Sequence, residues 1–384
     1  MIKKMLVGIL ILVSTQSIAQ KSWQWSLRGY VRSMQTISFA HPDSMWMNDN
    51  LIHNRLQLKA TWHDSLNFEA DIRNRLFYGE TVSNMPGYAL SADVDTGLVD
   101  ASFLVASGRS YFLISQLDRA FIDYRFRKWN FTVGRQRINW AQTFVWNPND
   151  IFNTYSFFDF DYDEKPGSDA IRIQHYTSNT SRVEFAAKTD SAHRLTAAAL
   201  WMFNRKGFDI QLLGGIYKSN DVVAGLGFSG NLFAGTLRGE MSWFAPTKNF
   251  GDTGNIAIVS VGYDYMFGKG IFLQTEVLYN PQGVASGRFN INDFYNLHIS
   301  PKNMSVSRWS AFGMMSASIN PLIKTNLSAM YYTGIHSMFV GPGITMSVSQ
   351  NTDLMLMAYH FREFSPANGS NRYTMLFGRL GWSF

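Results

Sequence analysis

Apolar and polar residues alternate along most of the chain, in segments of about ten residues that end at turn-forming residues. In the segment 50–63, Ile52 and Leu56 share one face of an extended strand, and His53 and Arg55 share the other. Side chains of a strand point alternately to its two faces, so such a segment has one apolar and one polar face. We expect strands at residues 23–38, 50–63, 65–78, 116–127, 129–138, 168–178, 181–189, 193–203, 207–218, 221–232, 234–244, 255–267, 270–280, 307–319, 322–333, 336–349, 352–362 and 371–384.

The connections between these segments alternate in length. Every second connection is a short turn, such as HDS at 63–65 and RKWN at 127–130. The long connections all fall on the other side; they are 39–49, 79–115, 139–167, 245–254, 281–306 and 363–370. Antiparallel strands that span an outer membrane have this arrangement, with short turns on one side and longer loops on the other. The pattern predicts an all-β transmembrane antiparallel barrel of about 18 strands in a single domain, or about 14 or 16 strands if 207–232 pairs differently.

The two ends of the chain support an outer-membrane location. Residues 1–19 have Lys3 and Lys4, then an apolar stretch too short to span a bilayer, then small residues. This pattern is typical of a cleaved secretory signal peptide, and the barrel would then occupy 20–384. The last strand has apolar residues at alternate positions, and we interpret Trp382 and Phe384 as a signal for the barrel-assembly machinery.

Composition agrees with a barrel more than with a soluble enzyme. Aromatic residues make up 15% of the chain and charged residues 16%, whereas charged residues usually make up about a quarter of a soluble domain. The chain has no cysteine, which excludes a disulfide scaffold and a thiolate nucleophile or metal ligand. The formal net charge is +6, which would fall to +4 without Lys3 and Lys4, so net charge alone says little about a partner.

Basic residues gather on the polar, inward faces of the N-terminal strands. A charge that faces lipid near the bilayer centre costs about 2–4 kcal/mol, so these faces should line a wet lumen. The predicted pore-lining, anion-contacting residues are Arg28, Arg32, Arg55, Lys59, Arg73, Arg119, Arg125, Arg135, Arg137 and Arg172. Further inward-facing basic residues are Arg75, Arg127, Arg182 and Lys188, and the few inward acids of the second half include Glu240 and Glu276.

This basic wall has two interpretations. A channel lined by one sign of charge concentrates ions of the other sign, so the arginines would favour anions. Alternatively, the arginines and the inward carboxylates form ladders that only hold the wall together through cross-strand pairs. The two interpretations are compatible with each other.

The strand that ends near residue 138 leads into a segment that cannot continue it. Pro148 lacks an N–H group and restricts Asn147. The aromatic residues of this segment suggest a loop that folds into the barrel mouth as a constriction, although a loop that merely caps the rim would fit as well. Within it, Trp140 is expected near the outer lipid interface, where amphipathic rings are favoured. The constriction candidates are Trp140, Trp146, Asn147, Pro148, Asp150, Phe152 and Asn153.

Other motifs give little evidence for metal binding, catalysis or nucleic-acid binding. Asp159, Asp161 and Asp163 have the spacing of the first ligands of a calcium loop, but Glu164 and Ala170 occupy its glycine and glutamate positions, so they are weak calcium candidates. Eight scattered histidines and the absence of nucleophile, zinc or phosphate-loop motifs give no basis for catalysis, and we expect no cofactor. Basic residues that alternate with lipid-facing ones do not suggest nucleic-acid binding.

The stretch LDRAFIDYRFRKWNFTVGRQRINWAQTFVWNPNDIFN, residues 117–153, resembles a recurring element of porin-like barrels of the alginate-export superfamily. The element combines a strand pair containing Gly134, Arg135 and Gln136 with a loop of the form NP-x-D-x-F-N. The resemblance implies an eighteen-stranded monomeric barrel with an arginine-rich lumen narrowed by inward loops, here 79–115 and 139–167. It also implies passage of an anionic solute or an acidic polysaccharide.

We therefore expect a passive outer-membrane channel for small polar solutes, in particular anionic ones, surrounded by outer-membrane lipid. The alternatives are an exporter of an acidic exopolysaccharide and a non-conducting structural or surface-binding barrel.

Overall fold

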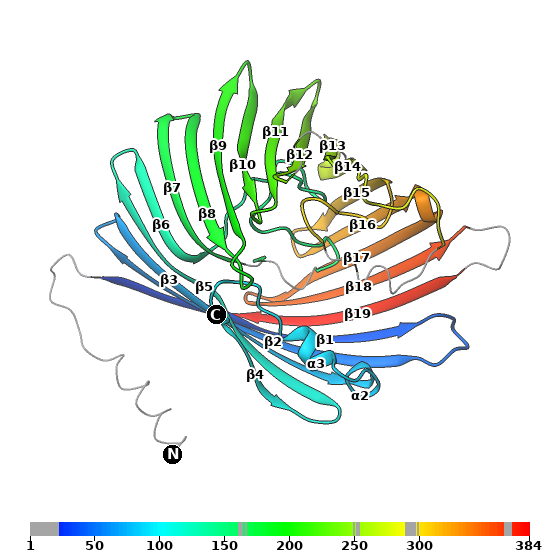
Figure 1. The fold of residues 1–384 in the computed structure, drawn as a ribbon. Coiled ribbons are helices and arrows are strands. Elements are labelled where there is room, and N and C mark those ends of the chain that lie inside the picture. The colour runs from blue at the N-terminus through cyan, green and yellow to red at the C-terminus, as the bar shows by residue number, and fades with distance from the viewer. Residues whose placement is uncertain are drawn as a thin grey trace.

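The computed structural model describes residues 23–159, 164–165, 167–248, 250, 254–288, 297, 299–364 and 371–384. The predicted signal peptide lies outside these residues. Nineteen strands belong to one sheet, and their ribbons surround a central space (Figure 1). They are β1 (Gln24–Phe39), β2 (Met47–Trp62), β3 (Leu66–Gly79), β4 (Ser102–Ser107), β5 (Tyr111–Phe126), β6 (Trp129–Gln136), β7 (Ser168–Ser178), β8 (Ser181–Thr189), β9 (Leu195–Arg205), β10 (Phe208–Tyr217), β11 (Asp221–Leu232), β12 (Gly235–Pro246), β13 (Ile256–Phe267), β14 (Ile271–Tyr279), β15 (Trp309–Asn320), β16 (Ile323–Tyr332), β17 (Ser337–Ser349), β18 (Thr352–Glu363) and β19 (Arg372–Ser383).

The sheet closes on itself. Each strand pairs antiparallel with its neighbours, and β19 pairs with β1, with Trp382 opposite Val31. β3 pairs with β5 rather than with β4, so β4 is not part of the continuous wall. The wall is therefore a closed antiparallel barrel of 18 strands, which confirms the predicted fold class and excludes the smaller strand counts.

β4 and two short helices, α2 (Glu80–Asn84) and α3 (Tyr88–Ala92), lie in the connection predicted as a loop at 79–115. β4 pairs only with the first half of β5, and β6 pairs with the second half on the same edge. Its sequence, SFLVAS, has adjacent apolar residues and no polar alternation, which is why the pattern did not predict a strand. Among the described residues, none of the helices has the length and apolarity that crossing a membrane would require.

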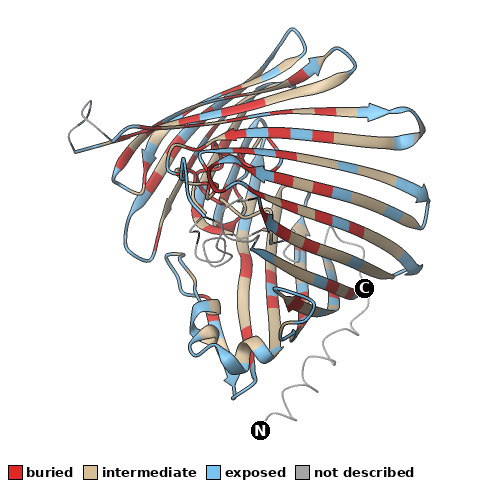
Figure 2. Ribbon diagram, turned by 90° about the vertical axis from the view of Figure 1, so that its right-hand side faces the viewer, coloured by how far each residue is buried: buried red, intermediate tan, exposed pale blue. Residues whose placement is uncertain are grey.

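The two faces of the wall differ as predicted. Residues such as Ile52 and Leu56 on β2 are exposed on the outer face, whereas His53 and Arg55 between them are buried on the inner face. Buried and exposed positions alternate along many strands, and buried coil lies inside the ring of strands (Figure 2). The interior thus contains packed chain in place of an empty channel.

The last residue takes part in closing the barrel. The main chain of Phe384 exchanges two hydrogen bonds with Gly29 of β1, at 3.0 and 2.9 Å. A Cβ atom on Gly29 would lie 2.6 Å from the Phe384 ring, so glycine leaves the space that this ring occupies. The side chains of Trp382 and Phe384 are exposed on the outside.

Gly134, near the end of β6, provides a test of how tightly β6 packs against β5 in the wall. Its φ of +116° is one that other residues rarely adopt, and a Cβ atom there would lie 2.2 Å from the Ala120 carbonyl oxygen. Gly134→Ala should lower the free energy of unfolding by about 1–3 kcal/mol, measured by urea titration in micelles. Gly378→Ala, where the nearest atom lies 3.7 Å from the new Cβ, is the control; equal losses would contradict this account.

Candidate functional site

The segment 137–167, here called the inward loop, leaves β6 and returns at β7. Its two arms are joined inside the barrel, because the Ile138 N–H donates to Asn153 Oδ1 at 3.0 Å. Arg137 donates to Asp150 Oδ2 at 2.7 Å and to the Asn153 carbonyl at 2.6 Å. Burial raises the pKa of the Asp150 carboxyl, and the neighbouring Arg137 and Lys188 only partly offset this effect. The loop therefore folds inward, and the alternative of a loop that only caps the rim is wrong.

Glu240 on β12 binds the main chain of the inward loop. Its Oε1 accepts the N–H groups of Gln142 and Thr143, the second at 2.7 Å, and its Oε2 accepts the Asn149 N–H at 2.9 Å. Ser242, two residues along the same strand, donates to Asn149 Oδ1 at 2.7 Å. One carboxylate on the wall opposite β6 thus fixes both ends of the segment 142–149.

Glu276 on β14 binds the middle of the same segment. It accepts the N–H groups of Phe144, Val145 and Trp146 at 3.0, 2.9 and 2.8 Å. The Ser260 hydroxyl of β13 donates to the same carboxylate at 2.7 Å. Together the two glutamates accept six main-chain N–H groups. We call residues 142–149 the crest of the inward loop.

Trp140 lies inside the barrel, and the expectation that it contacts the outer lipid interface is wrong. Its side chain is 2% exposed, and the indole Nε1 donates to Glu184 Oε1 of β8 at 2.7 Å. Arg172 and Gln174 of β7 donate to the same carboxylate. A buried indole N–H needs an acceptor, and here a lumen carboxylate supplies it.

The other constriction candidates are also buried within the lumen. The structure gathers Trp146, Asn147, Pro148, Asp150, Phe152 and Asn153 in the inward loop, all of them buried. Pro148 and Asn149 contact β12 through Ser242, and the Phe152 carbonyl accepts hydrogen bonds from Ser168 and Lys188 on the opposite side. The loop therefore crosses the lumen between two walls.

Several predicted anion-contacting arginines are neutralised by carboxylates. Arg55 is 1% exposed and pairs with Asp71 at 2.8 Å, Asp118 at 2.6 Å and Glu164 at 3.4 Å. Arg73 shares Asp118 at 3.2 Å. These pairs match the ladder interpretation, and Glu164 extends the ladder to the inward loop.

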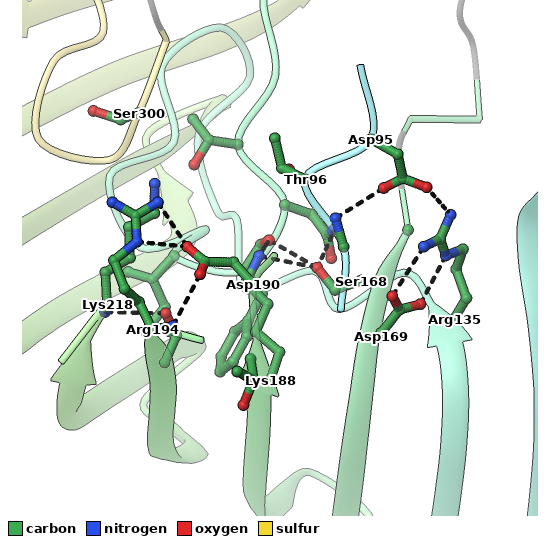
Figure 3. Close-up of a pocket in the computed structure, with 18 of the residues that line it drawn as sticks. Asp95, Thr96, Arg135, Ser168, Asp169, Lys188, Asp190, Arg194, Lys218 and Ser300 are labelled. Carbon is green, nitrogen blue, oxygen red and sulfur yellow. Dashed lines mark hydrogen bonds and ion pairs between the residues drawn. The ribbon is translucent and has the colours of Figure 1, made fainter. Parts of the chain in front are cut away.

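Arg135 joins four segments at the point where β4 and β6 meet on the edge of β5. It pairs with Asp95 at 2.5 Å and with Asp169 at 2.7 Å, and it donates to the carbonyls of Val99 and Leu117. Figure 3 shows its guanidinium between the two carboxylates. Its geometry is that of a structural tie between the 94–101 segment and the wall.

Five of the ten predicted basic residues line one cavity of about 590 Å³ toward the short-turn end of the strands, here called the basic vestibule. Its charged residues are the cations Lys59, Arg119, Arg125, Arg127, Arg137 and Arg172 and the carboxylates Glu69 and Asp123. Arg172 pairs with Glu184 and Arg137 with Asp150, whereas Arg125 is 64% exposed and contacts Asp123 at 3.4 Å. Even when Glu184 and Asp150 are counted, six cations face four carboxylates.

The remaining two predicted residues lie on β1, apart from this group. Arg32 stacks over the Tyr30 ring at 4.1 Å, and the Tyr30 hydroxyl donates to Glu164 at 3.1 Å. Arg28 is exposed and does not line the vestibule. The structure therefore divides eight of the ten predicted residues between buried ties and a basic cavity, and leaves Arg28 and Arg32 apart from both.

A second cavity, of about 260 Å³, lies toward the other end of the strands and is drawn in Figure 3. It is bounded by residues 94–97, the returning arm of the inward loop and residues 299–301, so the long connections 79–115, 139–167 and 281–306 all contribute to it. Arg194 pairs with Asp190 beside it at 2.7 Å. Lys188 and Lys218 also line it and have no ion-pair partner in the described part of the chain.

A third cavity, of about 940 Å³, adjoins the second and shares Thr96, Thr154, Lys218, Ile299 and Ser300 with it. Its other lining is mostly aromatic and methionine side chains of the inward loop and of β16, β18 and β19, including Phe157, Phe158 and Tyr359. The inward loop thus separates a basic vestibule from a larger space of mixed polarity.

Sequence reasoning placed Glu240 and Glu276 on inward faces and missed their role, because no sequence signal links a glutamate to main-chain N–H groups about a hundred residues away. Of the calcium candidates, Asp159 is described, and Asp161 and Asp163 lie outside the described residues. Within the described ranges, no three potential metal ligands form a group.

Comparison with known proteins supports the fold. No family model and no curated protein matches the chain. Among solved structures, OpdL of Pseudomonas aeruginosa has a TM-score of 0.57 at 9% identity, covering 94% of this chain and 99% of its own. OccAB1 of Acinetobacter baumannii has a TM-score of 0.55 at 10% identity, covering 96% and 99%. The outer membrane protein opdK of Pseudomonas aeruginosa has a TM-score of 0.54 at 10% identity, covering 94% and 99%.

The tie made by Arg135 can be tested through stability. Arg135→Ala leaves the carboxylates of Asp95 and Asp169, which are 7% and 15% exposed, without their shared cation. The free energy of unfolding should fall by about 3–5 kcal/mol, and limited proteolysis should begin to cut within 94–101. Arg125→Ala, which removes an exposed guanidinium, should change neither; similar effects of the two substitutions would contradict a structural role specific to Arg135.

Proposed function

We propose that this protein is an outer-membrane channel for the passive diffusion of small polar solutes, with a preference for anions. The observation that carries the proposal is the basic vestibule, a cavity in which six cations face two lining carboxylates. Inside a wall of low dielectric constant, such an excess of positive charge concentrates anions in the cavity and raises their rate of entry. Lys59, Arg125 and Arg127 contribute charges that are exposed within this space.

The outer face of the barrel supports a membrane location. Large apolar side chains are exposed on nearly every strand, which a soluble protein would bury. Exposed tryptophans near the short turns, such as Trp62, Trp129 and Trp201, match the aromatic girdle of outer-membrane barrels. We infer that outer-membrane lipid surrounds a single barrel, and that its terminal strand is recognised by the assembly machinery.

The resemblance of 117–153 to alginate-export barrels supports a distant relationship with that superfamily. Export of an acidic polysaccharide is the second candidate, favoured by this motif alone. A polymer needs a continuous opening along the barrel axis, and the inward loop crosses the lumen between β7–β8 and β12–β14. This geometry favours small solutes. We also propose transport in preference to catalysis, since the inward charges form ion pairs and a basic cavity.

Planar-bilayer recordings test the proposal. The wild-type channel should be anion-selective, and the combined substitution Lys59→Gln, Arg125→Gln and Arg127→Gln should lower the anion-to-cation permeability ratio several-fold, because the vestibule loses its exposed charges. Lys206→Gln, which removes a cation from a turn at the same end outside the cavity, is the control. Cation preference, or closed traces from correctly folded protein, would overturn the proposal.

A further inference from the structure

The crest of the inward loop is held by side-chain carboxylates in place of strand pairing. In the described part of the chain, the N–H groups of residues 142–146 and 149 all donate to Glu240 or Glu276. The main-chain hydrogen bonds near this point that do not involve them are Asp150 to Asn147 and Ile151 to Asn149, both at 3.0 Å. These two carboxylates accept most of the main-chain N–H groups of the crest, and Ser242 and the Leu226 carbonyl bind Pro148 and Asn149 in addition.

These carboxylates depend on the crest in return. Glu240 and Glu276 are each 2% exposed, and neither has an ion-pair partner among the described residues. A buried carboxylate without a counter-ion is costly unless several hydrogen bonds satisfy it. The six N–H groups and the hydroxyls of Thr143 and Ser260 supply these hydrogen bonds. Wall and loop therefore stabilise each other only while they are in contact.

The crest also contributes the side chains that narrow the lumen. Phe144 is 43% exposed, and its ring lies 6.3 Å from that of Phe312 on β15. Trp146 is buried beside the same ring, at 6.5 Å. Movement of the crest away from β12 and β14 would withdraw these rings from the lumen and widen the path.

We propose that Glu240 and Glu276 are positioning residues that hold the crest across the lumen and so set the cross-section of the pore. Their two carboxylates act as a latch on six main-chain N–H groups. The latch determines the size of the opening, and the basic vestibule on the other side of the loop determines the sign of the preferred ion. The inference goes beyond the proposed function and does not require anion preference.

Glutamine is a sharp probe of this latch because it keeps the shape of glutamate. In Glu240, one oxygen faces Gln142 and Thr143 and the other faces Asn149. An amide replaces one of these oxygens with an NH₂ group, which would place a side-chain N–H donor against a main-chain N–H donor of the crest. The double variant Glu240→Gln/Glu276→Gln should show a single-channel conductance raised by about two-fold or more, with added open-channel noise.

The control is Asp353→Asn, which removes a carboxylate from the inner face of β18 that has no hydrogen bond to the inward loop among the described residues. Its conductance should stay at the wild-type value. If the double variant does not fold, as judged by heat-modifiable mobility on gels, each single variant and Glu240→Asp should show a smaller rise. The aspartate keeps the charge but withdraws it by one methylene.

A disulfide can return the crest to its place. The chain has no cysteine, and a Cβ atom on Gly225 of β11 would lie 2.7 Å from Asn149 Oδ1. Adding Asn149→Cys and Gly225→Cys to the double variant should restore wild-type conductance when oxidised and lose it again on reduction.

The outcomes separate this inference from the proposed function. Wild-type conductance in the folded glutamine variants overturns the latch, whatever the ion preference. A wide but cation-selective channel supports the latch and overturns the proposed anion preference. Conduction by the double variant from an ion-tight wild type supports the latch, and closed traces from both overturn both proposals.

Discussion

The main-chain N–H groups of the inward loop must find acceptors inside a barrel whose strands already use their own carbonyls. A peptide group that is buried without a partner costs free energy comparable to a lost hydrogen bond. Glu240, Glu276 and Asn153 supply the acceptors here, and each hydrogen bond from an N–H to a carboxylate is charge-assisted. This requirement explains why the polar inner face carries two buried carboxylates that form no ion pair among the described residues. It also explains how a long irregular segment can be buried at all.

The inner charges divide into two groups with different consequences. Arg55 and Arg135 each form ion pairs with at least two carboxylates, so they stiffen the wall and add little net positive charge to the lumen. The vestibule keeps an excess of cations, because the chain places Arg125 and Arg127 near a turn with few acids. The ladder and anion-favouring interpretations of the basic wall therefore apply to different residues. The paired arginines stiffen the places where the loops join the wall. The excess of positive charge lies in the vestibule, where solvent enters.

Alternation along the chain was sufficient to predict the barrel, its strand count and the face on which most residues lie. This prediction works because a strand with one lipid-facing side must have an apolar residue at every second position. It failed for β4, where Phe103 and Val105 flank another apolar residue and the strand covers only part of β5. It also placed Trp140 outside the barrel, since a strand ending in tryptophan fits an interface as well as a buried indole. The acceptor that decides between these positions, Glu184, is 44 residues away in the sequence.

The candidate site was predictable only as a set of inward-facing side chains. Which arginines form ion pairs depends on the positions of four acids, and three of these lie in the long connections. The four are Asp95, Asp118, Asp150 and Glu164. The strand pattern carries no information about where such connections fold, because their positions follow from contacts between distant segments. The inward loop itself was recognisable because Pro148 ends strand pairing and because aromatic residues are costly to leave in water. The anchoring of the loop by Glu240 and Glu276 was not recognisable from the sequence. An inward-facing glutamate on a strand has the same sequence pattern whether it lines a pore or binds a loop that crosses the pore.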